Sequence, residues 1–167
     1  MLFRSNFNAG YVTVQITGGF NATQDKLSIR NQGTLSNEVA FDGYYVRYGN
    51  AAVGTVSYPT ADTMKIEFNS DAATTEAVSA LLQNITYNNT SVENPSAGNR
   101  TISITVNDGD GGSAAPQTTT VIVKPVNDSP IITNLAGAAM NYVEGDLPLG
   151  LDPDSNALVT EDRKSVV

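Results

Sequence analysis

The sequence predicts an all-β fold, an antiparallel β-sandwich with one short helix, followed by the start of a second repeat. Tyr11–Thr17 alternates apolar and polar residues, which is typical of a strand with one buried face. Asp42-Gly43 stands between two apolar runs and favours a tight hairpin turn. Thr101–Asn107 and Thr118–Lys124 are separated by a Gly/Asp/Ala-rich loop, as expected of two antiparallel neighbours.

The remaining elements are short. The other expected strands are rich in β-branched and apolar residues, and they are Lys26–Arg30, Val39–Phe41, Tyr44–Tyr48, Ala52–Tyr58, Met64–Phe68 and Ile85–Asn88. One helix is expected over Thr74–Asn84, with Thr74 or Thr75 as its N-cap. Strand alternation and the helical period together predict a core that contains Val12, Val14, Ile16, Leu81, Ile102, Ile104, Val106 and the inward residues of Thr118–Lys124.

A linker divides the chain. Pro125–Pro130 contains two prolines, which disfavour both a helix and a central strand. The strand pattern then restarts with Ile131–Leu135 and Met140–Val143. We therefore expect a first repeat over residues 6–126, truncated at its N-terminal side. The linker and the beginning of a second repeat occupy residues 127–161, which are too few to bury a core of their own.

The two ends of the chain differ from the body. Reverse translation of Met1–Ser5 and of Asp162–Val167 gives stretches that resemble a common short-read sequencing adapter in opposite orientations. We expect residues 1–5 and 162–167 to be adapter-derived and to make no core contacts.

Composition excludes several classes of function. The net charge is −8, from 9 basic and 17 acidic residues, which argues against nucleic-acid binding and suits divalent cations. The chain has no Cys and no His, so thiolate sites and the commonest general base are missing. No apolar run is long enough to span a membrane and no signal peptide begins the chain, so a secretion signal would lie outside it.

Three motifs in order carry a family resemblance. Val106–Gly112 closes one strand with an Asn-Asp-Gly-Asp-Gly-Gly run, Val121–Lys124 follows as a strand, and Val126-Asn127-Asp128-Ser129-Pro130 forms the linker. The chain resembles the cadherin-like tandem repeats, often called VNDxP repeats, of large secreted or surface proteins of bacteria. The resemblance implies an Ig/cadherin-like sandwich, an extracellular or bacterial cell-surface location, and junctions between repeats that are stiffened by Ca²⁺.

The same resemblance implies a set of calcium ligands. They are Asn127 and Asp128 in the linker, Asp152 and Asp154 early in the next repeat, Asp108 with Asp110 nearby, and Glu144 after the first short strand of the second repeat. It places Asp108 at the upstream end of the first repeat and the linker ligands at the opposite end, so no site is complete in this chain. Asp and Gly also favour tight turns, and turn chemistry alone remains the alternative for Asp108 and Asp110.

The implied function is a calcium-binding repeat that acts in cell adhesion or as a rigid extracellular spacer. Its partners would be neighbouring repeats of the same chain and a cell-surface protein or glycan. A metal-free stalk repeat and a non-catalytic carbohydrate-binding module are the alternatives. Tyr44, Tyr45 and Tyr48 could stack on sugars, or they could fill a sheet face. The sequence shows no constellation for catalysis, and we expect no enzymatic activity.

Overall fold

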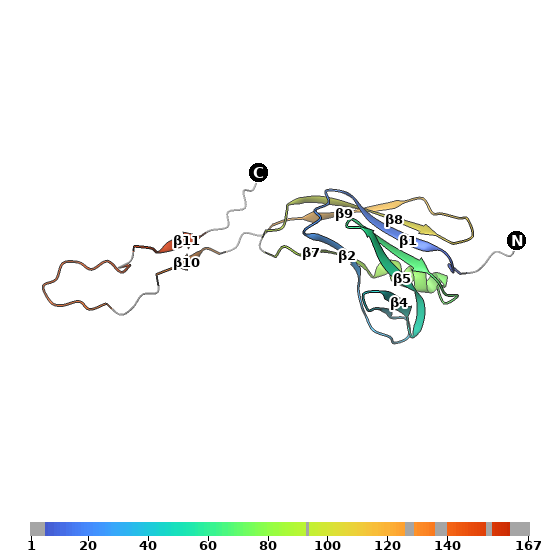
Figure 1. Ribbon diagram of the computed structural model, residues 1–167, viewed down its shortest axis with the longest axis horizontal. Coiled ribbons are helices and arrows are strands. Elements are labelled where there is room, and N and C mark those ends of the chain that lie inside the picture. Colours follow the sequence, from blue (N-terminus) through green and yellow to red (C-terminus); the bar gives the residue numbers. More distant parts are fainter. Residues whose placement is uncertain (1–5, 93, 126–128, 136–139, 153–154, 161–167) are drawn as a thin grey trace. The chain divides into compact units, whose positions relative to one another are not determined.

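A computed structural model describes residues 6–92, 94–125, 129–135, 140–152 and 155–160. These residues belong to two units, unit 1 over Met1–Lys124 and unit 2 over Pro125–Val167. Asn127, Asp128 and Asp154 lie outside the described residues, as do both ends that resemble an adapter. Figure 1 shows that unit 1 is built mostly of strands with one short helix.

A seven-stranded antiparallel sheet is the main element of unit 1. Its strands lie in the order β3-β4-β5-β6-β1-β8-β9. Their bounds are β1 Tyr11–Gly18, β3 Val39–Phe41, β4 Tyr45–Tyr48, β5 Ala51–Thr60, β6 Thr63–Phe68, β8 Gly98–Asn107 and β9 Gln117–Val123. Because β8 is antiparallel to both β1 and β9, β1 and β9 run in the same direction. The strand alternation predicted from sequence is visible along β1, where Val12, Val14 and Ile16 are buried.

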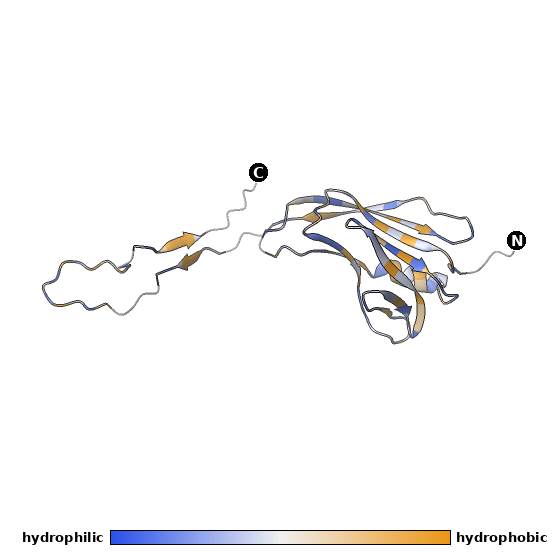
Figure 2. Ribbon diagram, viewed as in Figure 1, coloured by the Kyte–Doolittle hydropathy of each residue, from blue (hydrophilic) through white to orange (hydrophobic). Residues whose placement is uncertain are grey.

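A second layer covers one face of this sheet. It consists of the antiparallel pair β2 (Asp25–Ile29) and β7 (Ile85–Asn89) and of helix α1 (Thr75–Gln83). The predicted N-cap is confirmed, since the Thr74 hydroxyl accepts a hydrogen bond from the backbone N–H of Ala77. Leu81 of α1 and Leu27 of β2 join the apolar residues of the sheet in a single core. Figure 2 shows apolar residues alternating with polar ones along the strands, as two packed layers require.

The predicted core is confirmed in part. Val12, Val14, Ile16, Leu81 and Ile102 are buried, so the strand register inferred from the sequence is correct at β1 and β8. Ile104 and Val106 are only partly buried. For β9 the prediction is confirmed only in part: Val121 is partly buried against the core, whereas Thr119, which pairs with the buried Ile102, is exposed. β9 is an edge strand, so its inner face has a neighbouring strand on one side only.

In the described part of unit 2, β10 (Ile131–Thr133) and β11 (Leu158–Thr160) form a short antiparallel pair. The prediction of a strand over Met140–Val143 is wrong, because this segment pairs with no other strand. The sequence pattern also failed to predict β11. Every residue of β10 and β11 is exposed, so the pairing is not supported by a buried face. Within the described part of the chain, no helix has the length and apolar character needed to cross a membrane.

Candidate functional site

The loop between β8 and β9 holds the first two predicted calcium ligands. Asp108 Oδ1 accepts hydrogen bonds from the backbone N–H groups of Asp110 at 2.8 Å and of Gly112 at 2.9 Å. The backbone N–H of Asp108 donates to the Gly112 carbonyl at 3.0 Å and closes the loop. These are the turn interactions that the sequence left as the alternative. The other oxygen, Asp108 Oδ2, does not accept the bonds from Asp110 and Gly112. It lies so close to Gly112 that a Cβ added there would be only 2.4 Å away, so a side chain at this position would clash with the carboxylate.

This loop packs against the segment that leads into β1. Gly109 has a φ of +83°, and a Cβ there would lie 2.6 Å from the carbonyl carbon of Ala9 and 2.7 Å from the carbonyl oxygen of Asn8. Only glycine therefore allows the loop to approach so closely. Asp108 consequently lies at the end of unit 1 where β1 begins, as the resemblance implied. Figure 1 shows the β8–β9 loop and the beginning of β1 at one end of the sheet.

A third carboxylate contacts the same leading segment. Asp71 lies between β6 and α1, and its Oδ1 accepts hydrogen bonds from Asn8 Nδ2 at 2.8 Å and Asn6 Nδ2 at 3.3 Å. Since Asn8 also adjoins the Gly109 backbone, the β6–α1 loop and the β8–β9 loop flank residues 6–10. Sequence reasoning missed Asp71, because only the tertiary structure brings it next to residues 6–10.

Of the ligands predicted in unit 2, the structure describes Asp152 and Glu144. Asp152 Oδ2 accepts a hydrogen bond from the backbone N–H of Ala157 at 2.8 Å, and Glu144 is exposed. Over the described ranges, no three acidic side chains lie close enough together to hold a metal ion. The carboxylates of unit 1 thus offer oxygen ligands without forming a full coordination shell, which for Ca²⁺ needs six to eight oxygens.

A buried ion pair in unit 1 is a further polar feature that sequence reasoning missed. Asp25 in β2 is fully buried, and Arg100 in β8 is 2% exposed. Arg100 Nε donates to Asp25 Oδ2 at 2.7 Å, while Arg100 Nη2 donates to the Ser96 carbonyl at 2.8 Å. Tyr87 Oη and Asn89 Nδ2 donate to Asp25 Oδ1 at 2.5 and 3.0 Å, and the backbone N–H of Asn21 donates to Oδ2 at 2.7 Å.

The network keeps Asp25 ionised. Burial by itself raises the pKa of this carboxyl, but hydrogen bonds from Tyr87, Asn21, Arg100 and Asn89 more than offset burial, so the pKa lies below its ordinary value. Burial and the bond to Asp25 raise the pKa of Tyr87. Because both Asp25 oxygens are already bonded on all sides by protein groups, this carboxylate serves structure: it ties β2, β7 and β8 together.

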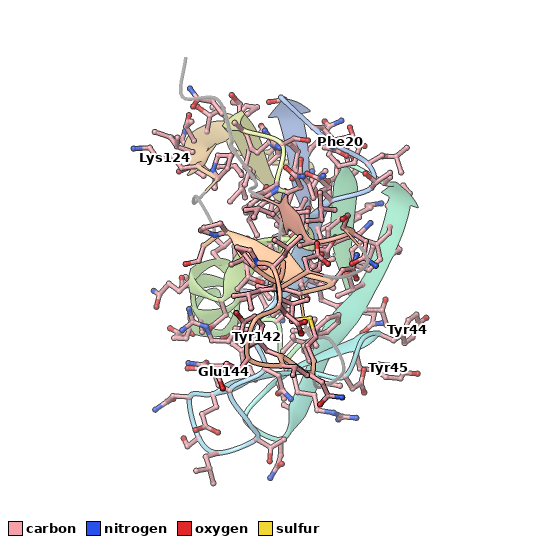
Figure 3. All side chains as sticks on the ribbon, turned by 90° about the vertical axis from the view of Figure 1, so that its left-hand side faces the viewer. Phe20, Tyr44, Tyr45, Lys124, Tyr142 and Glu144 are labelled. Carbon is pink, nitrogen blue, oxygen red and sulfur yellow. The ribbon has the colours of Figure 1, made fainter. Side chains whose placement is uncertain are left out.

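The three tyrosines do not form one surface. Tyr48 is half-buried and packs against the core, with its hydroxyl donating to Asn37 Oδ1 at 3.1 Å. Tyr44 and Tyr45 are exposed, and their rings meet edge to face with centroids 4.7 Å apart. Figure 3 shows both rings projecting away from the ribbon. The sheet-filling interpretation therefore holds for Tyr48, while the other two are available to contact a ligand.

Comparison with known proteins gives no closer identification: no protein-family model, no curated protein and no solved structure matches the chain at a significant level.

Proposed function

We propose that unit 1 is a cadherin-like repeat with an Ig-like sandwich fold, and that the parent is a bacterial surface protein whose repeats are joined by Ca²⁺. Its function would be cell adhesion or rigid extracellular spacing. The observation that carries the proposal is the direction of the strands. Because β1 and β9 run in the same direction, the chain enters unit 1 at the end that holds Asp108 and leaves it at the opposite end.

This topology suits a linear array of repeats. Carboxylates of the β8–β9 loop stand where a preceding linker would enter, and the linker with Asn127 and Asp128 follows β9 at the other end. Each junction would then combine ligands from two repeats, which agrees with the incomplete acidic set of unit 1. Local hydrogen bonds already hold Asp108 Oδ1, so an ion would meet a preformed loop with Oδ2 as the ligand.

The test needs a chain extended to a complete repeat on each side of unit 1. Ca²⁺ that binds only the folded junction stabilises it by about 2.7 kcal/mol when free Ca²⁺ exceeds the dissociation constant about 100-fold. We expect the melting temperature to rise by roughly 5–10 °C in Ca²⁺ relative to chelator. Asp108→Asn keeps the acceptor oxygen that closes the loop and removes the charge, so it should reduce the response at the upstream junction.

The matched control is Asp62→Asn. Asp62 is also a turn carboxylate bonded by neighbouring hydroxyls, but it lies next to Gln15, at the end of β1 opposite to Asp108. This variant should keep the full calcium response of the upstream junction. A melting temperature that is the same in Ca²⁺ and in chelator would contradict the proposal and favour a metal-free stalk.

A further inference from the structure

A small pocket with both apolar and polar walls opens on the outer face of β3 and β4. Strand pairing sets Ala40 opposite Arg47, and Asp42 and Tyr45 follow on the same face. The segment Asn31–Thr34 forms the opposite wall. The pocket has a volume of about 280 Å³, just below the range of about 300–1,000 Å³ that is usual for drug-sized ligands. It can therefore hold one small ring, and we call it the Tyr45 pocket.

The wall of the pocket is held in place by hydrogen bonds along the edge of the sheet. Asn31 Oδ1 accepts from the backbone N–H of Phe41 at 3.3 Å, and Gln32 exchanges bonds with Val39 through its backbone N–H and its Oε1. Gly33 has a φ of +135°, which other residues rarely adopt. A site whose walls are already fixed loses less entropy when a ligand binds.

The polar groups of the pocket carry opposite charges that balance. Asp42 Oδ1 accepts the backbone N–H groups of Tyr45 at 2.7 Å and Tyr44 at 3.0 Å, which orients the carboxylate. These two bonds, together with the nearby Arg47 guanidinium, lower the pKa of Asp42, so the carboxylate is charged at neutral pH. The pocket thus offers a strong acceptor, a strong donor and no net charge.

The aromatic ring supplies an apolar surface next to these charges. Tyr45 lines the pocket and is 46% exposed, and its ring meets that of Tyr44 edge to face at an interplanar angle of 87°. An apolar ligand would cover Asp42 and Arg47 without giving either a hydrogen-bond partner. A phosphate would be attracted by Arg47 but repelled by Asp42. A neutral sugar ring matches all three groups, since its hydroxyls both donate and accept while its C–H face packs on an aromatic ring.

We propose that the Tyr45 pocket binds one neutral pyranose unit of a glycan. This goes beyond the calcium-dependent joining of repeats and does not depend on it, because all the lining residues belong to unit 1 and none of them is among the proposed metal ligands.

The experiment uses the full 167-residue chain in chelator, so that calcium plays no part. The probes are neutral oligosaccharides of glucose, mannose and galactose, with an oligouronate as the charged comparison. Binding is followed by the backbone amide NMR signals of Asp42, Tyr45 and Arg47. We expect at least one neutral sugar to shift these three signals in a saturable manner. Tyr45→Ala should weaken that binding by at least about tenfold, because a buried aromatic contact often dominates such sites.

Two further variants separate binding from folding. Tyr45→Phe keeps the ring and should retain the affinity within a few-fold. Tyr58→Ala removes a tyrosine of similar exposure, 50%, that does not line this pocket, and it should leave binding unchanged. The proposal is overturned if none of the neutral sugars shifts the three signals, if only the oligouronate binds, or if Tyr45→Ala and Tyr58→Ala weaken binding equally.

Discussion

Units 1 and 2 both contain stretches of strand-forming sequence, but the apolar residues of these strands are largely buried in unit 1 and exposed in unit 2. In unit 1 the apolar face of each inner strand meets a second layer, and Met64 and Ile66 are completely buried. In unit 2, Ile131, Ile132, Leu158 and Val159 are each more than half exposed. A two-stranded hairpin is marginally stable in water, because it has no second layer to cover it. The difference shows that β-strand pattern is not sufficient for a core; enough chain to form two layers is also needed.

The comparison extends to polar groups. Unit 1 buries a charged pair together with its hydrogen-bond partners, and no buried side-chain N or O atom among the described residues lacks a partner. In unit 2, Asp146 and Asp152 accept hydrogen bonds from backbone N–H groups of their own loops, those of Val143 and Ala157. Unit 1 is therefore the part of the chain in which single substitutions should have large effects.

The largest expected effect comes from breaking the Asp25–Arg100 pair. Asp25→Ala leaves a buried guanidinium without its partner, which costs about 3–5 kcal/mol in the free energy of unfolding. Urea denaturation of unit 1, followed by circular dichroism, measures the loss. The double variant Asp25→Leu with Arg100→Met removes both charges and should recover much of it. A loss below about 1 kcal/mol for Asp25→Ala would show that the pair is not buried in solution.

The second prediction compares one leucine from each unit. Leu81 is 1% exposed in the core of unit 1, and Leu147 is 86% exposed in unit 2. Leu81→Ala should cost about 2–5 kcal/mol through lost burial and the cavity left behind, whereas Leu147→Ala should change stability by less than about 0.5 kcal/mol. The free energies of unfolding of both variants are measured by the same urea titration. A large effect of Leu147→Ala would mean that unit 2 has a buried face that this structure does not contain.

The smallest expected effect concerns acid. The pKa of Asp25 is lower in the folded chain than in the unfolded chain, so the folded state binds fewer protons in that range. The resulting stability is present above the unfolded pKa of about 3.9 and is lost as the pH falls through the folded pKa. It amounts to about 1.4 kcal/mol for each unit by which the two values differ. Unfolding of unit 1 should therefore become easier below about pH 4.

Asp25→Asn provides the control for the acid effect. This variant is less stable at neutral pH, but it lacks the titrating carboxyl, so its stability should fall less steeply over the same pH interval. Equal slopes for the wild type and the variant would assign the acid sensitivity to other carboxylates, such as Asp42, Asp62 and Glu76, whose pKa values are also lowered.

Local pattern was enough to predict most of unit 1. The strands around Val12 and Ile102, the turn at Asp42-Gly43 and the N-cap of α1 follow from residue period and turn chemistry, and the structure confirms them. The same reasoning was wrong at Thr119 and at Met140–Val143, because burial of an edge strand and pairing of a short segment depend on neighbours that lie far away in the sequence.

The sequence by itself determined the all-β class and the position of helix α1. The ligands Asp108, Asp110, Asn127, Asp128, Glu144, Asp152 and Asp154 came from the resemblance of its motifs to cadherin-like repeats and stay a prediction. Only the tertiary structure decided that Asp25 meets Arg100, which lies 75 residues further along the chain, and that Asp71 contacts Asn8. It alone placed Asp42, Tyr45 and Arg47 around one pocket. The physical reason is that alternation and turn signals act over a few residues, whereas a charged pair or a pocket depends on which strands become neighbours when two layers close over a core.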